Sequence, residues 1–392
     1  MRKTKKFAAI LLSALILSSS FSVLPVSAAT VGNDAAVMSV NSTLTSGNYQ
    51  YKVLYDNTIC ISRYIGEEEN VTIPAKINGL TVTTIGKNAF ALTGLGCLHI
   101  PASITDIKPN AFKFSGFNKI EVDKNNLNYT SINGVLFSKD KTVLLAYPKE
   151  NSATSYIIPD GVKIIESTAF MGTSNLNSIV IPNGVTTIKE NAFYLCSNLK
   201  NISIPTSVKS IGRDAFDFSV CSKVNNGYYI SNCLIGADNE INGNFTIKDG
   251  TRLVADSAIK GNENLESITV PASVEIIGDC ALNFSSESLK NITVANENKY
   301  FSSENGVLFN KSKTELLCYP YGKNETTYTV PNTVTKLAKA SFSNCKLNKL
   351  NLPNNLKYID ESAFQEISLK SLSIPESVEY IGKYTFFLSG IE

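Results

Sequence analysis

The sequence predicts a repeat solenoid of short parallel strands with little helix, and three observations predict it. One apolar motif returns ten times between Tyr49 and the end of the chain. Its regular copies follow one another after 22 or 23 residues, and a Phe-type position always comes five residues after an Ile-type position. Self-similarity at such a period is typical of solenoids, in which each repeat covers the apolar edge of its neighbour.

The motif is clearest in residues 176–193 and 199–216, which read LNSIVIPNGVTTIKENAF and LKNISIPTSVKSIGRDAF. In each copy, isoleucines two residues apart point to the same side of an extended segment, which is therefore a strand. The proline that follows has no amide hydrogen to donate and ends the strand. Ile-Pro pairs or their Val and Leu variants begin at residues 73, 100, 158, 181, 204, 270, 330, 352 and 374, and a tenth copy has Ile247-Lys248.

The Phe-type position predicts an aromatic spine inside the solenoid. Large rings at one position of successive repeats can stack, and each buries a large apolar area. Three residues later lies a polar ladder, whose small side chains we expect to satisfy backbone groups where the chain turns. The spine contains Phe90, Phe112, Phe170, Phe193, Phe216, Phe342, Phe364 and Phe386, and the ladder contains Thr93, Ser115, Thr173, Cys196, Ser219, Asn262, Ser285, Cys345 and Ser389.

The two ends of the chain carry different signals. Residues 1–28 read as a signal peptide with a basic start, an apolar run from Phe7 to Leu17 and a Val-Ser-Ala cleavage site. The run is short for a membrane span, so a permanent anchor is the weaker alternative. Residues 29–48 are predicted to be a flexible linker, and residues 49–392 the repeat array. The sequence stops soon after Phe386 without a polar cap, so we expect either a frayed last turn or a following domain.

Composition and the motifs that are absent indicate a folded protein without enzymatic activity. Hydrophobic residues make up 43% and charged residues 18%, which is enough apolar surface to form a core. The formal net charge is +2, and loss of the four basic residues in the signal peptide leaves −2, so nucleic acid is not an expected partner. One histidine, no tryptophan and no Gly-x-Ser-x-Gly, His-Glu-x-x-His or paired Cys–His motif lead us to expect no catalysis, metal or cofactor.

Insertions near residues 122–157, 220–246 and 294–329 interrupt the regular copies. The first and third are the same insertion at an offset of 172 residues, from Asn133-Gly134 and Asn305-Gly306 onward. Both read as β-hairpins, and the second is a degenerate version. Insertions in a solenoid project on one face, so they form either a binding rim that includes Tyr147, Tyr319 and Tyr321 or hairpins packed into the core.

Two further patterns suggest other chemistry but have structural explanations. Asp238-x-Glu240-x-Asn242-Gly243 resembles a calcium loop, yet Asp238 aligns with the hairpin turns of the other insertions. The eight cysteines lack a clustered framework, so we expect buried free thiols, with Cys221 and Cys233 as the best candidate pair.

The run L-x-x-I-x-I-P-x-x-V-x-x-I-x-x-x-A-F-x-x-C/S/T resembles the leucine-rich repeat of the BspA-like family of bacterial surface proteins, over about 340 residues. The resemblance implies a right-handed leucine-rich-repeat superhelix with hairpin insertions. It also implies a secreted or cell-surface adhesion role, with host extracellular-matrix or plasma glycoproteins as partners. It supplies no binding motif that can be assigned to particular residues.

The outward positions of the predicted strands form a candidate partner-binding surface, called the partner face below. It is polar, nearly uncharged and poor in the aromatic and arginine anchors of tight interfaces. Three functions stay open: an adhesin or protein-binding scaffold, a wall-associated spacer with weak multivalent contacts, and a glycan-binding module that lacks tryptophan. The partner face consists of His99 (with Cys97 beside it), Lys119, Glu121, Ser178, Val180, Asn201, Ser203, Ser267, Thr269, Asn291, Thr293, Lys349, Asn351, Ser371 and Ser373.

Overall fold

The computed structural model describes residues 42–94, 96–282 and 287–391. Short strands and turns make up this part of the chain, and its one helical element is the three-residue 3₁₀ helix η1 (Phe218–Val220). The predicted solenoid of short strands with little helix is therefore confirmed. The predicted signal peptide and residues 29–41 of the predicted linker lie outside the described residues.

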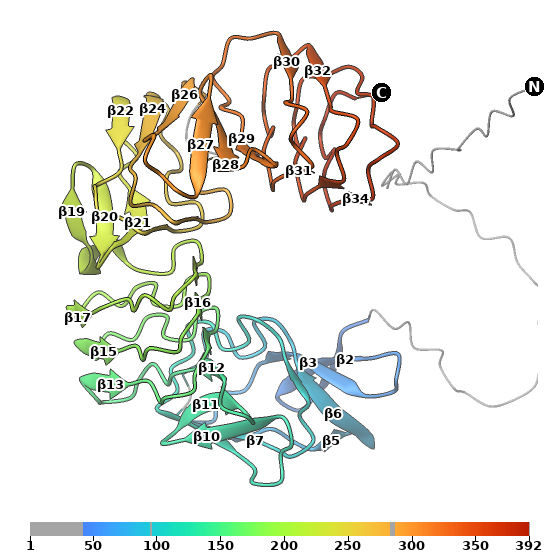
Figure 1. Ribbon diagram of the computed structural model, residues 1–392. Helices are drawn as coiled ribbons and strands as arrows, with labels where there is room; N and C mark the ends of the chain where they lie inside the picture. Colours follow the sequence, from blue (N-terminus) through green and yellow to red (C-terminus); the bar gives the residue numbers. More distant parts are fainter. Residues whose placement is uncertain (1–41, 95, 283–286, 392) are drawn as a thin grey trace, which may run out of the picture. The chain divides into compact units, whose positions relative to one another are not determined.

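One set of strands, the face strands, corresponds to the strands predicted from the repeat, most of which precede a proline, although β9, β22 and β26 do not (Figure 1). They form four separate parallel sheets, β4-β7-β9, β13-β15-β17, β22-β24-β26 and β30-β32. Within a sheet, strands of successive repeats pair in register, as Ser178 with Asn201 and Ile179 with Ile202. Proline ends the pairing, as Pro101 does directly after β7. The face strands are β4 (Asn70–Thr72), β7 (Cys97–Ile100), β9 (Lys119–Val122), β13 (Ser155–Ile157), β15 (Ser178–Val180), β17 (Asn201–Ile202), β22 (Gly243–Thr246), β24 (Leu265–Val270), β26 (Asn291–Val294), β30 (Thr327–Thr329) and β32 (Lys349–Asn351).

A second set, the return strands, contains the Ile-type position of each repeat. These strands have two residues each and also pair in parallel, as Ile165 with Ile188 and Ile188 with Ile211. Their second residue faces the core between the two sets, except in β34, where Ile381 is 45% exposed. The return strands are β8 (Asp106–Ile107), β14 (Ile164–Ile165), β16 (Thr187–Ile188), β18 (Ser210–Ile211), β23 (Leu253–Val254), β25 (Ile276–Ile277), β31 (Lys336–Leu337), β33 (Tyr358–Ile359) and β34 (Tyr380–Ile381).

Four antiparallel meanders extend the return strands. The last strand of each meander pairs in parallel with the solenoid strand that follows it, as Leu144 does with Ile165 and Leu316 with Leu337. The meanders are β1 (Leu44–Ser46), β2 (Tyr49–Val53) and β3 (Ile59–Tyr64), followed by β5 (Lys76–Ile77) and β6 (Leu80–Ile85); β10 (Tyr129–Ile132), β11 (Val135–Ser138) and β12 (Val143–Ala146); β19 (Ser222–Val224), β20 (Gly227–Ile230) and β21 (Cys233–Ala237); and β27 (Phe301–Glu304), β28 (Val307–Asn310) and β29 (Glu315–Cys318).

The first meander corrects the predicted linker. Leu44–Ser46 forms β1 and pairs with β2, so the last residues of the 29–48 segment belong to the folded array. The small, polar composition of this segment concealed the strand because β1 is an edge strand that packs only in part.

A left-handed backbone residue precedes each Ala-Phe pair. Asn110 has φ 63°, Asn191 has φ 58° and Cys280 has φ 52°. Asparagine tolerates this conformation better than most residues, and it occupies the position in three copies, at Asn88, Asn110 and Asn191. Cys280 occupies the same position, so it is a substitute for Asn and not a member of a disulfide framework.

The phenylalanines stack in three separate groups. Phe170 lies 4.9 Å from Phe193 and Phe193 lies 5.0 Å from Phe216, measured between ring centroids, with nearly parallel planes. The other two groups join Phe90 to Phe112, and Phe342 through Phe364 to Phe386. Six members are fully buried, whereas Phe112 is half-buried and Phe386 is 37% exposed. The groups are separated where Ile259 and Leu282 replace phenylalanine and where the meanders enter.

The polar ladder bonds to carbonyl groups of the spine. The hydroxyl of Thr173 donates to the carbonyl of Phe170, three residues earlier, at 2.8 Å. Ser115 donates both to Phe112 and to Phe90 of the preceding repeat, and the Cys196 thiol donates to Phe170 of the preceding repeat at 3.0 Å. Each turn is thus tied to itself and to its neighbour. Ser285 lies outside the described residues.

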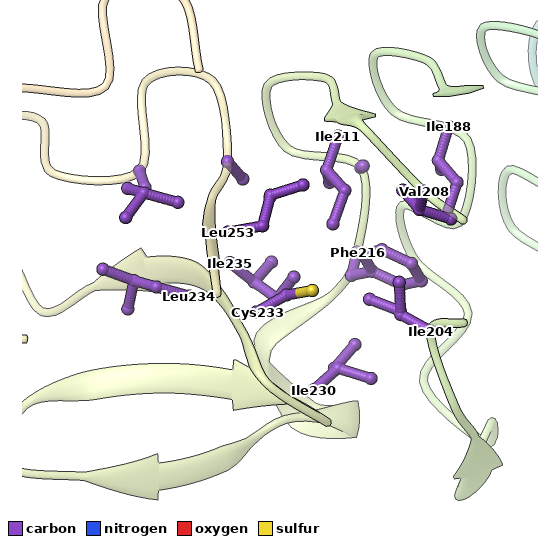
Figure 2. Close-up of a cluster of buried hydrophobic side chains, with 14 of the residues drawn as sticks. Ile188, Ile204, Val208, Ile211, Phe216, Ile230, Cys233, Leu234, Ile235 and Leu253 are labelled. Carbon is purple, nitrogen blue, oxygen red and sulfur yellow. The ribbon is translucent and has the colours of Figure 1, made fainter. Parts of the chain in front are cut away.

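The insertions pack into the core. Leu136 and Phe137 in β11, and Leu308 and Phe309 in β28, are at most 1% exposed. Figure 2 shows the same continuity at the second insertion, where Ile230 and Cys233 of the meander lie beside Phe216 of the preceding repeat. Of the two alternatives for the insertions, the packed hairpins are the ones observed.

Candidate partner-binding face

The face strands direct most of the predicted partner face outward. Along β15, Ile179 is 3% exposed, whereas Val180 is 50% exposed. Register then aligns outward residues of successive repeats, as Thr269 with Thr293. The other members on face strands are all exposed or half-buried: His99, Lys119, Glu121, Ser178, Asn201, Ser267, Asn291, Lys349 and Asn351.

Three predicted members lie outside strands. Ser203 follows the end of β17, and Ser371 and Ser373 lie in an extended segment that forms no ladder with β32. All three are exposed, so they border the partner face without sharing its regular spacing.

An apolar spot on this face was missed by the sequence reading. Ile157 in β13 pairs with Val180 in β15, and their side chains are 72% and 50% exposed. Two neighbouring aliphatic side chains in an otherwise polar surface are the kind of feature that a protein partner covers. Only Val180 was predicted, although the spacing that selected it also places Ile157 outward.

A second missed feature is a polar cluster on β7 and β9. His99 pairs with Glu121, and Cys97 pairs with Lys119, in neighbouring strands. The Nδ1 atom of His99 lies 3.0 Å from Oε2 of Glu121, Lys119 forms an ion pair with the other Glu121 oxygen, and Nε2 of His99 lies 3.5 Å from Sγ of Cys97. The expectation that cysteine and histidine do not pair is wrong here. The sequence did contain the signal for this contact, because Cys97 and His99 are two residues apart on a strand and therefore share a face.

Tyr147 and Tyr319 do not form a binding rim. They are 5% and 3% exposed, and their rings stack on Phe170 and Phe342 at 5.1 and 5.3 Å. Their amides donate to Ala169 and Ser341, as the Phe170 amide donates to Ala192. Both tyrosines therefore occupy the Phe-type position and begin a group of the spine, which corrects the prediction for them.

Tyr321 is half-buried, and its ring lies beneath the ammonium group of Lys346, 5.1 Å from the ring centroid. It is the one member of the predicted rim that reaches the surface, and it stays a candidate.

All eight cysteines are free, and Cys221 and Cys233 are not paired. Burial raises the pKa of the Cys196 thiol to about 11 and that of the Cys221 thiol to about 12. Thiols in this state are inert packing groups. The segment that resembles a calcium loop is a turn between β21 and β22, in which Asp238 pairs with Lys223 at 2.6 Å and accepts from Tyr228 at 2.5 Å.

A charged cavity of about 540 Å³ lies along the return strands, and residues that follow them line it, among them Glu190, Arg213, Asp256 and Asp279. Burial raises the pKa of Asp256 to about 6, although its Oδ1 atom accepts a hydrogen bond from the Asp279 amide at 3.0 Å. A folded pKa above the ordinary value of 3.8 means that the charged carboxylate destabilises the native state.

Asp256→Asn is expected to be stabilising near neutral pH and neutral in acid. The penalty of wild-type Asp256 is absent below its unfolded pKa and grows as pH rises through about 6. With a discount for partial exposure, the gain is about 1 kcal/mol at about pH 7.5. Denaturation midpoints of both proteins at about pH 4 and 7.5 measure it. A variant less stable than wild type by the same amount at both values would show that this carboxylate carries no penalty.

The repeats match the BspA type leucine rich repeat region over residues 66–151, 145–235, 238–315 and 316–392. The chain belongs to this family. Among the described residues, no helix has the length and apolar character needed to cross a membrane. No curated protein matches the sequence significantly.

Several solved structures are similar to this chain at low identity. The pneumococcal vaccine antigen PcpA is 23% identical over 88% of this chain and 78% of its own, with a TM-score of 0.31. A leucine rich cell surface protein from Faecalibacterium prausnitzii is 23% identical over 86% and 83%, with a TM-score of 0.30. A leucine-rich repeat protein from Bacteroides ovatus is 19% identical over 82% and 92%, with a TM-score of 0.32.

Proposed function

We propose that this chain is a secreted or cell-surface scaffold that binds a protein partner through its partner face and catalyses no reaction. Membership of the BspA-type family and the signal-peptide pattern of residues 1–28 support the location. By family resemblance, extracellular-matrix and plasma glycoproteins are the first partners to test.

The observation that carries the proposal is the outward face of the face strands. Within each of the four sheets of face strands, parallel pairing in register repeats one surface from strand to strand, so a partner that lies across a sheet meets similar groups at regular intervals. Hydroxyl and amide groups on this surface can donate and accept hydrogen bonds, and Ile157 with Val180 adds an apolar contact. Exposed apolar side chains with a polar surround commonly mark sites of protein–protein contact.

A wall-associated spacer is the second candidate function. The face has few charged residues and only one apolar spot, so single contacts with it are weak and gain strength only from several copies. This candidate predicts retention on cell-wall material without saturable binding to any one protein.

Ile157→Ser combined with Val180→Ser is expected to weaken partner binding by about tenfold or more, because it removes the apolar anchor. The mature chain is immobilised and tested against extracellular-matrix and plasma glycoproteins and, in parallel, against cell-wall material. Both side chains are exposed, so the thermal midpoint should change little.

Leu127→Ser is the matched control, because Leu127 is 82% exposed and lies outside the face strands. It should bind as wild type does. Equal binding by the double variant and wild type, or equal loss in the control, contradicts a role for the partner face. Retention on cell-wall material alone supports the spacer.

A further inference from the structure

The polar cluster on β7 and β9 has the geometry of a metal site. Cys97, His99 and Glu121 each offer one ligand atom, and these atoms lie within 4.8 Å of one another. It is the only such group among the residues that the structure describes. The cluster is held by two regular strands, because Cys97 and His99 lie two apart on β7 and Glu121 is the register partner of His99 on β9.

The distance between sulfur and nitrogen fits one bound ion. Zinc binds thiolate sulfur at about 2.3 Å and imidazole nitrogen at about 2.0–2.1 Å, so two such ligands of a tetrahedral ion are about 3.5 Å apart. Sγ of Cys97 and Nε2 of His99 are 3.5 Å apart. An ion can therefore bind both atoms without a change in their separation.

Glu121 occupies the position of an orienting carboxylate. Its Oε2 atom lies 3.0 Å from Nδ1 of His99, on the ring nitrogen that faces away from Cys97. A carboxylate that accepts from the second ring nitrogen fixes the tautomer and the direction of a metal-binding histidine. Lys119 holds the other oxygen of Glu121, so the carboxylate is itself fixed in place.

The solvent exposure of the cluster also suits the binding of an ion. Cys97 is 4% exposed and forms the base of the cluster, while the side chains of His99 and Glu121 are 43% and 40% exposed. An ion can reach the cluster from solvent. The same exposure lets water, or a group of a bound partner, supply further ligands.

We infer that Cys97 and His99 bind a Zn²⁺ ion through Sγ and Nε2, with Glu121 as the residue that orients the imidazole. Binding replaces the thiol proton of Cys97, which leaves to solvent. The inference does not depend on the proposed partner binding. A surface ion pair would involve His99 and Glu121 but not the thiol of Cys97, so participation of the thiol distinguishes a zinc site from such a pair.

Titration of the reduced, tag-free mature chain with zinc chloride tests whether Cys97 and His99 bind zinc. We expect one ion per chain, no binding in His99→Gln, and affinity lower by about tenfold in Glu121→Gln. The chain has a single histidine, so its imidazole signals in a ¹H–¹⁵N spectrum report on His99 alone and should shift on zinc addition. Zinc should also protect Cys97 from alkylation, as read by peptide mass spectrometry.

Cys60→Ser is the matched control, because Cys60 is a half-buried free thiol outside the cluster. It should bind zinc as wild type does. Cys97→Ser should abolish binding, and His99→Gln gives the same test at an exposed position if the serine variant does not fold. Absence of binding at one ion per chain, or binding that survives His99→Gln, overturns the inference. A Cys97 thiol alkylated at the same rate with and without zinc overturns it as well.

Discussion

Phe193→Ala is expected to lower the free energy of unfolding by about 3–5 kcal/mol. The Phe193 ring is completely buried and stacks on Phe170 and Phe216, at 4.9 and 5.0 Å between centroids. Its removal leaves a cavity between two repeats that the strands on either side hold apart. Urea denaturation followed by circular dichroism measures the change.

Tyr194→Ala is the control for this variant. Tyr194 is the next residue along the chain and is 36% exposed, so its truncation removes less buried area than that of the fully buried Phe193. We expect a change of about 0.5 kcal/mol or less. If both variants unfold at the wild-type midpoint, the stacked rings do not stabilise the solenoid.

Asn298→Ala should destabilise the protein by a similar amount, about 3–5 kcal/mol. Asn298 is 0% exposed, and its amide group uses its full hydrogen-bonding capacity. Nδ2 donates to the carbonyls of Pro271 and Val274, both at 2.9 Å, and Oδ1 accepts from the amides of Tyr300 and Phe301, both at 2.8 Å. Alanine removes all four bonds at the point where the third insertion joins its repeat, and only the Pro271 carbonyl keeps another partner, the Val274 amide at 3.3 Å.

Asn355→Ala provides the comparison, since Asn355 is exposed and makes one bond, to the carbonyl of Asn332 at 2.8 Å. Its loss should change the denaturation midpoint only slightly. Asn126 repeats the Asn298 arrangement in the first insertion, so Asn126→Ala should resemble Asn298→Ala. Equal effects of the exposed and buried substitutions would show that these bonds contribute no more than surface contacts.

The regular repeats could be predicted from the sequence because each of their positions has one physical requirement. Alternating isoleucines define a strand, proline ends it, and a phenylalanine at constant spacing must face the core. The left-handed residue ahead of each Ala-Phe pair is less evident in the sequence, because it is asparagine in only three copies.

The insertions were harder to predict, because the same residue type can be exposed or buried there. Tyr147 and Tyr319 have hydroxyl groups that suggest a surface, yet their rings replace phenylalanine in the spine. Asn126 and Asn298 are polar residues in irregular segments and gave no sign of burial, although the offset of 172 residues repeats them. A buried polar group is recognisable only when its hydrogen-bond partners are known, and the two carbonyl partners of each asparagine come from the preceding repeat.

The partner face was predictable in its position but not in its chemistry. Strand alternation decides which side chains point outward, and this holds for His99 and Val180 alike. Contacts between strands depend on register, which a single motif does not fix. The adjacency of His99 with Glu121, and that of Ile157 with Val180, therefore became visible only when the strands were paired.

Native-state hydrogen exchange on Phe193→Ala tests most directly whether each repeat is stabilised by its immediate neighbours. The Phe170 and Phe193 amides donate to Ala192 and Ala215 in the next repeats, whereas Phe342 lies in a separate core cluster. Nearest-neighbour coupling predicts faster exchange at Phe170 and Phe193 and unchanged exchange at Phe342. An equal loss of protection at Phe342, or no loss at Phe170, would contradict it.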